Sequence, residues 1–91
     1  KTGETKFLHN GKFPCYALYR LKDGHYAALA AVEDKFWEAF TKAIGLDIDA
    51  NLRFHHKDDS IFLKVSEKLK TLDSAELQKL TSGTEMCLNI L

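Results

Sequence analysis

The sequence predicts a small α+β domain that contains a β-hairpin, a third antiparallel strand and about three helices. Three observations support this fold class: two apolar runs separated by a glycine-containing turn, apolar residues at helical spacing after the second run, and a closing segment of alternating residues. A chain of 91 residues suits a single hydrophobic core. We therefore expect residues 13–91 to form one domain, preceded by a polar linker or arm at residues 1–12.

The hairpin is predicted from two segments, residues 13–21 and residues 26–32, which are rich in apolar and aromatic side chains. The residues Lys22-Asp23-Gly24 between them supply a turn in which glycine can adopt a positive φ. Residues 27–32 offer apolar side chains to both faces, as expected of a sheet that is covered on both sides. One face should therefore pack on the domain's own helices, and the other should meet a partner domain.

Three helices are predicted after the hairpin. The first covers residues 34–44, because apolar residues recur there at the spacing of one helical face and Gly45 stands where a left-handed C-terminal cap is expected. The second begins near residues 58–60, where aspartate and serine can cap it, and the third begins at Asp73, which forms a capping box with Glu76. Their apolar faces are formed by Phe36, Trp37, Phe40 and Ile44, then by Ile61, Phe62, Val65, Leu69 and Leu72, and finally by Leu77 and Leu80.

The end of the chain predicts the third strand. Ser82 and Gly83 should stop the last helix. After them the sequence alternates with the period of a strand, and this strand should pair with the hairpin. One face of this strand would carry Met86, Leu88 and Ile90, and the other would carry Cys87 and Asn89.

Charge and hydropathy exclude two classes of partner. The 13 basic residues balance 13 acidic ones, so no net field attracts nucleic acid or an anionic membrane. The longest strongly apolar run, residues 26–32, is far shorter than the roughly 20 residues that span a bilayer. We expect neither nucleic-acid binding nor membrane insertion.

The cysteines and histidines do not predict a metal site. Cys15 and Cys87 lack metal-ligand spacing, and we interpret them as buried free thiols. His55 and His56 are adjacent, so their side chains point in different directions in a strand or a helix. A zinc site would need further ligands that the sequence does not offer at suitable spacing.

Glu33 is the one candidate catalytic residue. It follows an unbroken apolar strand and heads the helix that contains Trp37, where a carboxylate can cap the helix. From the residues alone, capping is favoured over catalysis, and core packing is favoured over a ligand-binding stripe for Tyr16, Tyr19, Tyr26 and Trp37. The sequence contains no G-x-S-x-G, Walker A, dinucleotide-binding or H-E-x-x-H motif.

A longer pattern suggests a family. P-x-Y-x-x-Y-x-x-x-D-G is followed by an apolar strand, an acidic residue and an aromatic helix that ends in isoleucine and glycine. This order resembles the family III CoA-transferases, and within them the α-methylacyl-CoA racemase branch. The matching residues are Pro14, Tyr16, Tyr19, Asp23, Gly24, Glu33, Phe36, Trp37, Phe40 and Gly45.

The resemblance implies an enzyme that acts on acyl-CoA thioesters and is built from a large Rossmann-like domain and a small domain, with two chains interlocked as a dimer. It implies that an aspartate of the large domain is the key catalytic group, and that Glu33 joins the active-site network by reaching a histidine of that domain. Coenzyme A would enter as the thioester substrate, with no tightly bound cofactor. The expected location is the cytoplasm, or mitochondria or peroxisomes in a eukaryote.

This chain would then be the small domain, excised from a two-domain enzyme and inactive alone. The absence of an initial methionine and the end inside the apolar residues 88–91 fit that expectation. Whether the parent enzyme is a racemase or a transferase stays open at this stage. The alternative is a stand-alone protein-interaction module without catalysis, in which apolar strand edges recruit a partner.

Overall fold

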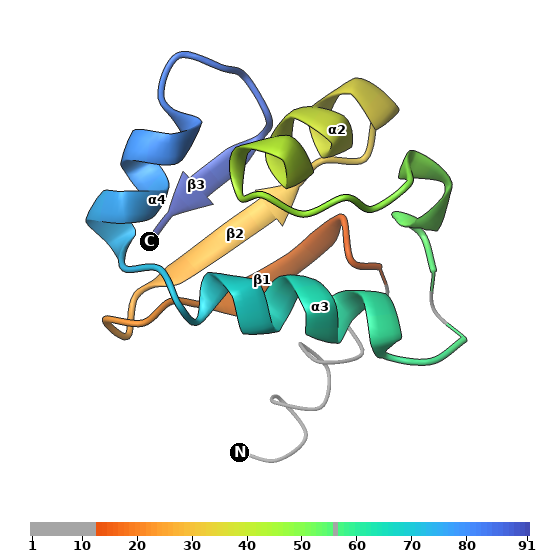
Figure 1. Ribbon diagram of the computed structural model, residues 1–91, viewed down its shortest axis with the longest axis horizontal. Coiled ribbons are helices and arrows are strands. Elements are labelled where there is room, and N and C mark those ends of the chain that lie inside the picture. Colours follow the sequence, from red (N-terminus) through yellow and green to blue (C-terminus); the bar gives the residue numbers. More distant parts are fainter. Residues whose placement is uncertain (1–12, 56) are drawn as a thin grey trace.

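One antiparallel sheet of three strands organises the chain in the computed structural model, which describes residues 13–55 and 57–91 (Figure 1). Strand β2 lies in the centre, between β1 and β3. The predicted α+β domain with a hairpin and a third antiparallel strand is thus confirmed. The bounds are Tyr16–Arg20 for β1, Tyr26–Ala30 for β2 and Leu88–Ile90 for β3.

The hairpin has the predicted turn but shorter strands. Tyr16 lies opposite Ala30, and Arg20 lies opposite Tyr26. Gly24 has a φ of 90°, a conformation that glycine adopts without steric cost. The turn is fixed to the rest of the fold by Asp23, whose Oδ2 accepts hydrogen bonds from the amide and the hydroxyl of Ser74 at 3.1 and 2.7 Å.

The three predicted helices are present, together with one short 3₁₀ helix. Their bounds are Asp34–Ala43 for α2, Ala50–Leu52 for η1, Ser60–Leu69 for α3 and Ser74–Thr81 for α4. Gly45 follows α2 with a φ of 78°, which confirms the predicted left-handed end of this helix. In Figure 1, α2 and α3 lie in front of the sheet, and α4 lies on the side of β3. None of the described helices is long and apolar enough to cross a membrane.

Two details of the later helices differ from the prediction. Helix α3 ends at Leu69, so Leu72 lies beyond it and is half-buried. In α4, Leu77 is fully buried but Leu80 is 47% exposed. Leu80 follows Leu77 by three residues, which is about 60° short of a full helical turn. Leu80 therefore lies at the edge of the buried face, whereas Leu77 lies at its centre.

The core lies between the sheet and the helices. Tyr19 stacks on Phe62 of α3, with ring centroids 5.0 Å apart, and its hydroxyl donates to the carbonyl of Pro14. Trp37 is completely buried, and its indole nitrogen donates to the carbonyl of Ile48 at 3.2 Å. The other large buried side chains include Leu21, Leu29, Phe40, Ile44, Val65, Leu69 and Leu77.

The opposite face of the sheet carries exposed side chains. Tyr16 is 57% exposed and Tyr26 is 37% exposed, because strand alternation turns them away from buried Tyr19. Core packing is therefore confirmed for Tyr19 and Trp37 and was wrong for Tyr16 and Tyr26. No helix among the described residues covers this face, and its contact with a partner domain stays a prediction.

The capping box at the start of α4 provides a test of the fold. Asp73 accepts a hydrogen bond from the amide of Glu76 at 2.8 Å, and the Glu76 carboxylate accepts one from the amide of Asp73 at 3.0 Å. We expect Asp73→Ala to lower the free energy of unfolding by about 1 kcal/mol, because an amide of the first turn loses its acceptor. Urea denaturation measures the loss. Asp47→Ala, in an exposed loop, is the matched control, and an equal loss in both variants would contradict the capping role.

Candidate active site

The chain turns sharply from β2 into α2 at residues 30–34, which we call the β2–α2 corner. The amide of Ala30 donates to the carbonyl of Cys87 at 2.9 Å, and the amide of Ala31 donates to the carbonyl of Cys15 at 2.8 Å. The two acceptors lie on opposite sides of β2, one next to β1 and the other next to β3. The strand that leads to the corner is therefore held from both sides.

The next peptide groups of the corner are bonded as well. The carbonyl of Val32 accepts a hydrogen bond from Nε of Arg53 at 2.7 Å. The carbonyl of Glu33 accepts two amides from the first turn of α2, from Phe36 at 3.1 Å and from Trp37 at 3.0 Å. Because successive peptide groups are fixed in this way, the point at which the Glu33 side chain leaves the backbone is set by hydrogen-bonded elements rather than by a loop.

Glu33 occupies the N-cap position of α2 but does not cap the helix with its side chain. Its backbone is extended, with φ −77° and ψ 145°, and within the described residues its carboxylate accepts no capping hydrogen bond. The side chain is 65% exposed, and its Oε1 lies 3.9 Å from Nζ of Lys35. The predicted position at the head of α2 is confirmed, but the expected side-chain cap is wrong. Residues with shorter acceptor side chains than glutamate, such as serine and aspartate, are the usual caps at this position.

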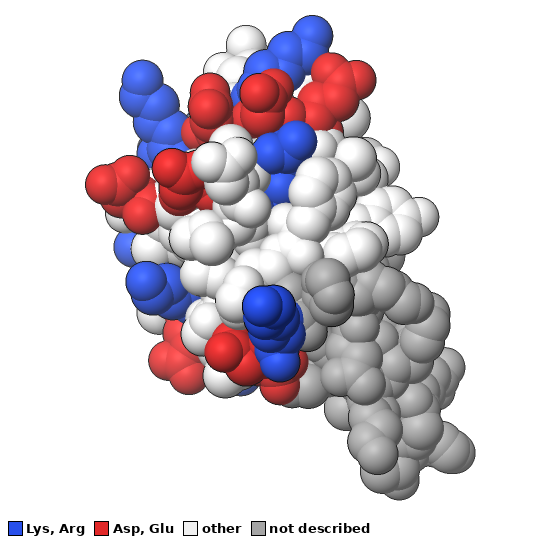
Figure 2. All heavy atoms as spheres, turned by 90° about the vertical axis from the view of Figure 1, so that its right-hand side faces the viewer, with Lys and Arg blue, Asp and Glu red and all other residues white. Residues whose placement is uncertain are grey.

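Exposed apolar side chains lie around the corner. Val32 is 44% exposed, and Phe54, which follows the arginine that binds Val32, is 37% exposed. Phe13 packs edge-on against Phe54, with ring centroids 5.2 Å apart. Figure 2 shows the side of the molecule where η1 lies, with uncharged side chains between charged groups above and below. These exposed apolar side chains are suited to contact with another molecule.

The two cysteines support the corner with their carbonyls rather than with their thiols. Both thiols are free, and Cys15 is fully buried as predicted, whereas Cys87 is only partly buried. Burial raises the pKa of the Cys15 thiol, and burial together with the neighbouring Glu85 carboxylate raises the pKa of Cys87. Raised pKa values keep both thiols protonated and poorly nucleophilic at neutral pH.

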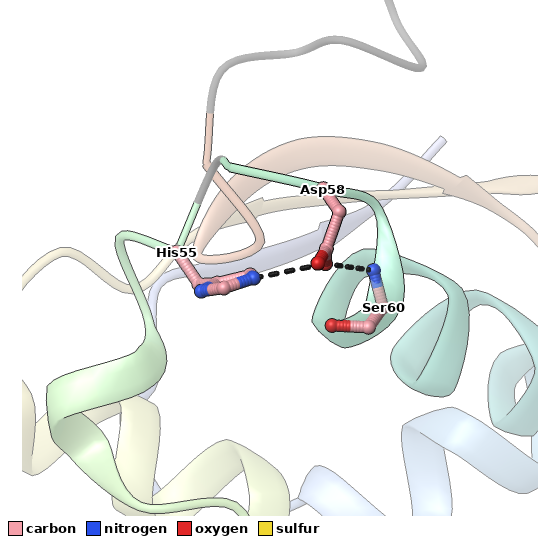
Figure 3. A network of polar contacts seen from close by, with 3 residues as sticks. All are labelled: His55, Asp58 and Ser60. Carbon is pink, nitrogen blue, oxygen red and sulfur yellow. Dashed lines mark hydrogen bonds and ion pairs between the residues drawn. The ribbon is translucent and has the colours of Figure 1, made fainter.

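His55 binds a carboxylate in this structure (Figure 3). Its Nε2 lies 2.9 Å from Oδ1 of Asp58, and the same oxygen accepts the amide of Ser60 at 2.9 Å. The first amide of α3, that of Ser60, is thus bound by the Asp58 carboxylate, one residue before the N-cap residue Asp59. His56 lies outside the described residues. Within residues 13–55 and 57–91, no group of three or more histidine, cysteine, aspartate or glutamate side chains is arranged to hold a metal ion.

The Asp58 contacts predict a dependence of stability on pH. Hydrogen bonds from Ser60, and then from His55, hold the pKa of Asp58 well below the ordinary aspartate value of about 4. The ionised carboxylate therefore stabilises the folded chain above that pH, and this stabilisation is lost as the pH falls toward the lowered pKa. We expect Asp58→Asn to flatten the acid side of a plot of unfolding free energy against pH, whereas Asp47→Asn should not. A slope below pH 4 that Asp58→Asn leaves unchanged would contradict this role.

Arg53 is the residue of the corner that sequence reasoning missed. It lies in residues 46–57, a segment without sustained periodicity, and nothing in that pattern indicates which main-chain groups its side chain reaches. A basic residue between Leu52 and Phe54 was the available signal, because a charged group flanked by apolar ones often has a partner. The bond to Val32 spans 21 residues and is visible only in the fold.

The fold and the corner define a small α+β domain that presents one carboxylate from a rigid junction of strand and helix. The chain belongs to CoA-transferase family III, whose sequence model matches residues 2–89. It is also 30% identical over 80 residues to α-methylacyl-CoA racemase from Homo sapiens. The matched region covers 86% of this chain and 21% of that relative, so the chain spans about a fifth of the relative's length. The predicted resemblance is confirmed at the level of the family.

Proposed function

We propose that this chain is the small domain of a larger acyl-CoA enzyme and that Glu33 contributes to its active site at a domain interface. One observation carries the proposal: an exposed carboxylate that does not cap its helix projects from the β2–α2 corner, where the preceding residue Val32 is exposed as well. Capping was the structural role that the sequence favoured for this glutamate, and its carboxylate does not fill that role. The family and the racemase relative support acyl-CoA thioesters as the substrate class.

The proposed reaction is α-proton transfer on a 2-methylacyl-CoA thioester, as the name of the relative suggests. Glu33 would bind an imidazole of the large domain through a charge-assisted hydrogen bond. Such a bond fixes the tautomer of the imidazole and stabilises its charged form, so the ring can deliver or remove a proton. The aspartate that the family resemblance implies would also come from the large domain. Coenzyme A is part of the substrate in this proposal, and no tightly bound cofactor is required.

The partners of the chain would be the large domain and the second subunit of an interlocked dimer. The exposed face of the sheet supports this part of the proposal, because Tyr16 and Tyr26 expose large aromatic surface that a partner would bury. We propose a cytoplasmic location, or mitochondria or peroxisomes in a eukaryote. The same exposed face would also serve a stand-alone interaction module without catalysis, which is the second candidate function.

Isotope exchange separates these functions. The full-length protein is incubated with 2-methylacyl-CoA in deuterated water, and the α-deuterium content of the thioester is measured by mass spectrometry. A racemase incorporates deuterium at the α-carbon, whereas a CoA-transferase moves labelled CoA to an added carboxylic acid without this exchange. The 91-residue chain alone should do neither. Absence of both reactions in the full-length protein would favour the interaction module.

A further inference from the structure

Arg53 joins the β2–α2 corner to the segment around η1. Its Nε donates to the carbonyl of Val32 at 2.7 Å, and its Nη1 donates to the carbonyl of Ala50 at 2.6 Å. The planar guanidinium holds several donors in a fixed fork, so one side chain can bind two carbonyls from separate segments in a defined geometry. A lysine ammonium at the same position could not reproduce this fixed, two-directional arrangement.

The Arg53 fork is itself held in place. The guanidinium carbon lies 4.7 Å from the centroid of the Phe54 ring, a cation–π contact that orients the plane. The main chain of Arg53 is bonded as well, because its amide donates to Ala50 at 3.1 Å and its carbonyl accepts the amide of Cys15 at 3.2 Å. The side chain therefore reaches Val32 from an anchored backbone.

The carbonyl of Val32 belongs to the peptide group that also contains the nitrogen of Glu33. Rotation of this peptide plane changes ψ of Val32 and φ of Glu33, and so changes the direction in which the Glu33 side chain leaves the backbone. The neighbouring ion pair with Lys35 cannot fix that direction, because the two side chains are 65% and 71% exposed and their charged atoms are 3.9 Å apart.

We propose that Arg53 is a positioning residue for Glu33, and that it acts by holding the Val32 carbonyl so that the carboxylate keeps its direction toward the imidazole that it would bind. This inference rests on the proposed function of Glu33 and adds a residue that acts through it. Loss of the arginine donors frees the peptide plane and spreads the carboxylate over several directions. An active-site group that is displaced by about 1 Å can lose about 100-fold in rate.

The test is a double-mutant cycle in the full-length protein with Arg53→Met, Glu33→Gln and the combined variant. The readout is turnover of 2-methylacyl-CoA by α-deuterium exchange. We expect Arg53→Met to lower kcat by about 10- to 100-fold with little change in KM, and Arg53→Lys to lose less. In the Glu33→Gln background, Arg53→Met should cost less than about twofold, because its effect passes through the missing carboxylate. Equal fold losses in both backgrounds would overturn the proposal.

A second readout does not depend on activity. Hydrogen exchange of the Phe36 and Trp37 amides, which bind the Glu33 carbonyl, should be about tenfold faster in Arg53→Met than in the unmodified protein, with a smaller increase in Arg53→Lys. Arg20→Met, at the opposite end of the hairpin, is the matched control and should leave these amides unchanged. Unchanged exchange in both Arg53 variants would overturn the positioning role. Full turnover in Glu33→Gln alone would instead defeat the proposed function, whatever the exchange rates.

Discussion

Glu33→Gln is expected to lower turnover of the full-length enzyme by about 100- to 10,000-fold, the range that a positioned acid–base group contributes. Glutamine has nearly the same shape as glutamate but carries no charge, so it cannot stabilise a charged imidazole. The free energy of unfolding should change by less than about 0.5 kcal/mol, because the side chain is 65% exposed and its ion pair with Lys35 is long. Steady-state kinetics and urea denaturation of the same preparation measure the two effects.

Glu38→Gln is the matched control for this substitution. Glu38 is an exposed glutamate on the same helix, one turn beyond the corner, so its neutralisation removes the same charge at nearly the same place in the chain. Turnover of Glu38→Gln should stay within about twofold of the unmodified enzyme, because surface charges away from a site have small effects. Comparable losses of stability and turnover in Glu33→Gln would contradict a role in catalysis and would indicate that Glu33 is structural.

Trp37→Ala is expected to cost about 3–5 kcal/mol of stability, the largest effect of any single substitution discussed here. The indole is completely buried, and it ties α2 to the following segment through the carbonyl of Ile48. Truncation leaves a cavity and also deprives that carbonyl of its donor. Small domains are stable by only about 5–15 kcal/mol, so this loss is a large fraction of the total and should shift the urea midpoint to a much lower concentration.

Urea denaturation followed by far-ultraviolet circular dichroism measures the Trp37 effect without relying on indole fluorescence. Trp37→Phe should lose less than Trp37→Ala, because an aromatic ring refills part of the space. Leu80→Ala is the control, since Leu80 is 47% exposed on α4, and it should lose less than about 1 kcal/mol. If Trp37→Ala lowered the free energy of unfolding as little as Leu80→Ala, the indole would not be a major contributor to the stability of the core.

The elements of the fold were predictable where local chemistry determines them. The positive φ at Gly24 and Gly45 and the capping box of Asp73 and Glu76 depend on residues close together in the chain, and all are present. The burial of Tyr16 was mispredicted because apolar character alone does not say which face of a strand is covered. Sheet alternation decides that question, and it depends on which side the helices pack.

The candidate site was predictable only in part, for a related reason. The position of Glu33 follows from the order of strand and helix, which the sequence displays. Its freedom from capping depends on the direction of one side chain, and the contact of Arg53 with Val32 depends on tertiary structure that joins segments 21 residues apart. Neither property leaves a periodic signal in the sequence.

The most direct test of the proposed function is a structure of the full-length enzyme with a non-reactive acyl-CoA analogue bound. We predict that the Glu33 carboxylate lies within hydrogen-bonding distance, about 2.6–3.2 Å, of an imidazole that faces the α-carbon of the acyl group. Exposed Val32 and Phe54 should then be covered by the large domain or the second subunit. An analogue bound elsewhere, with the Glu33 carboxylate still directed into solvent, would contradict the assignment of Glu33 to the acyl-CoA site.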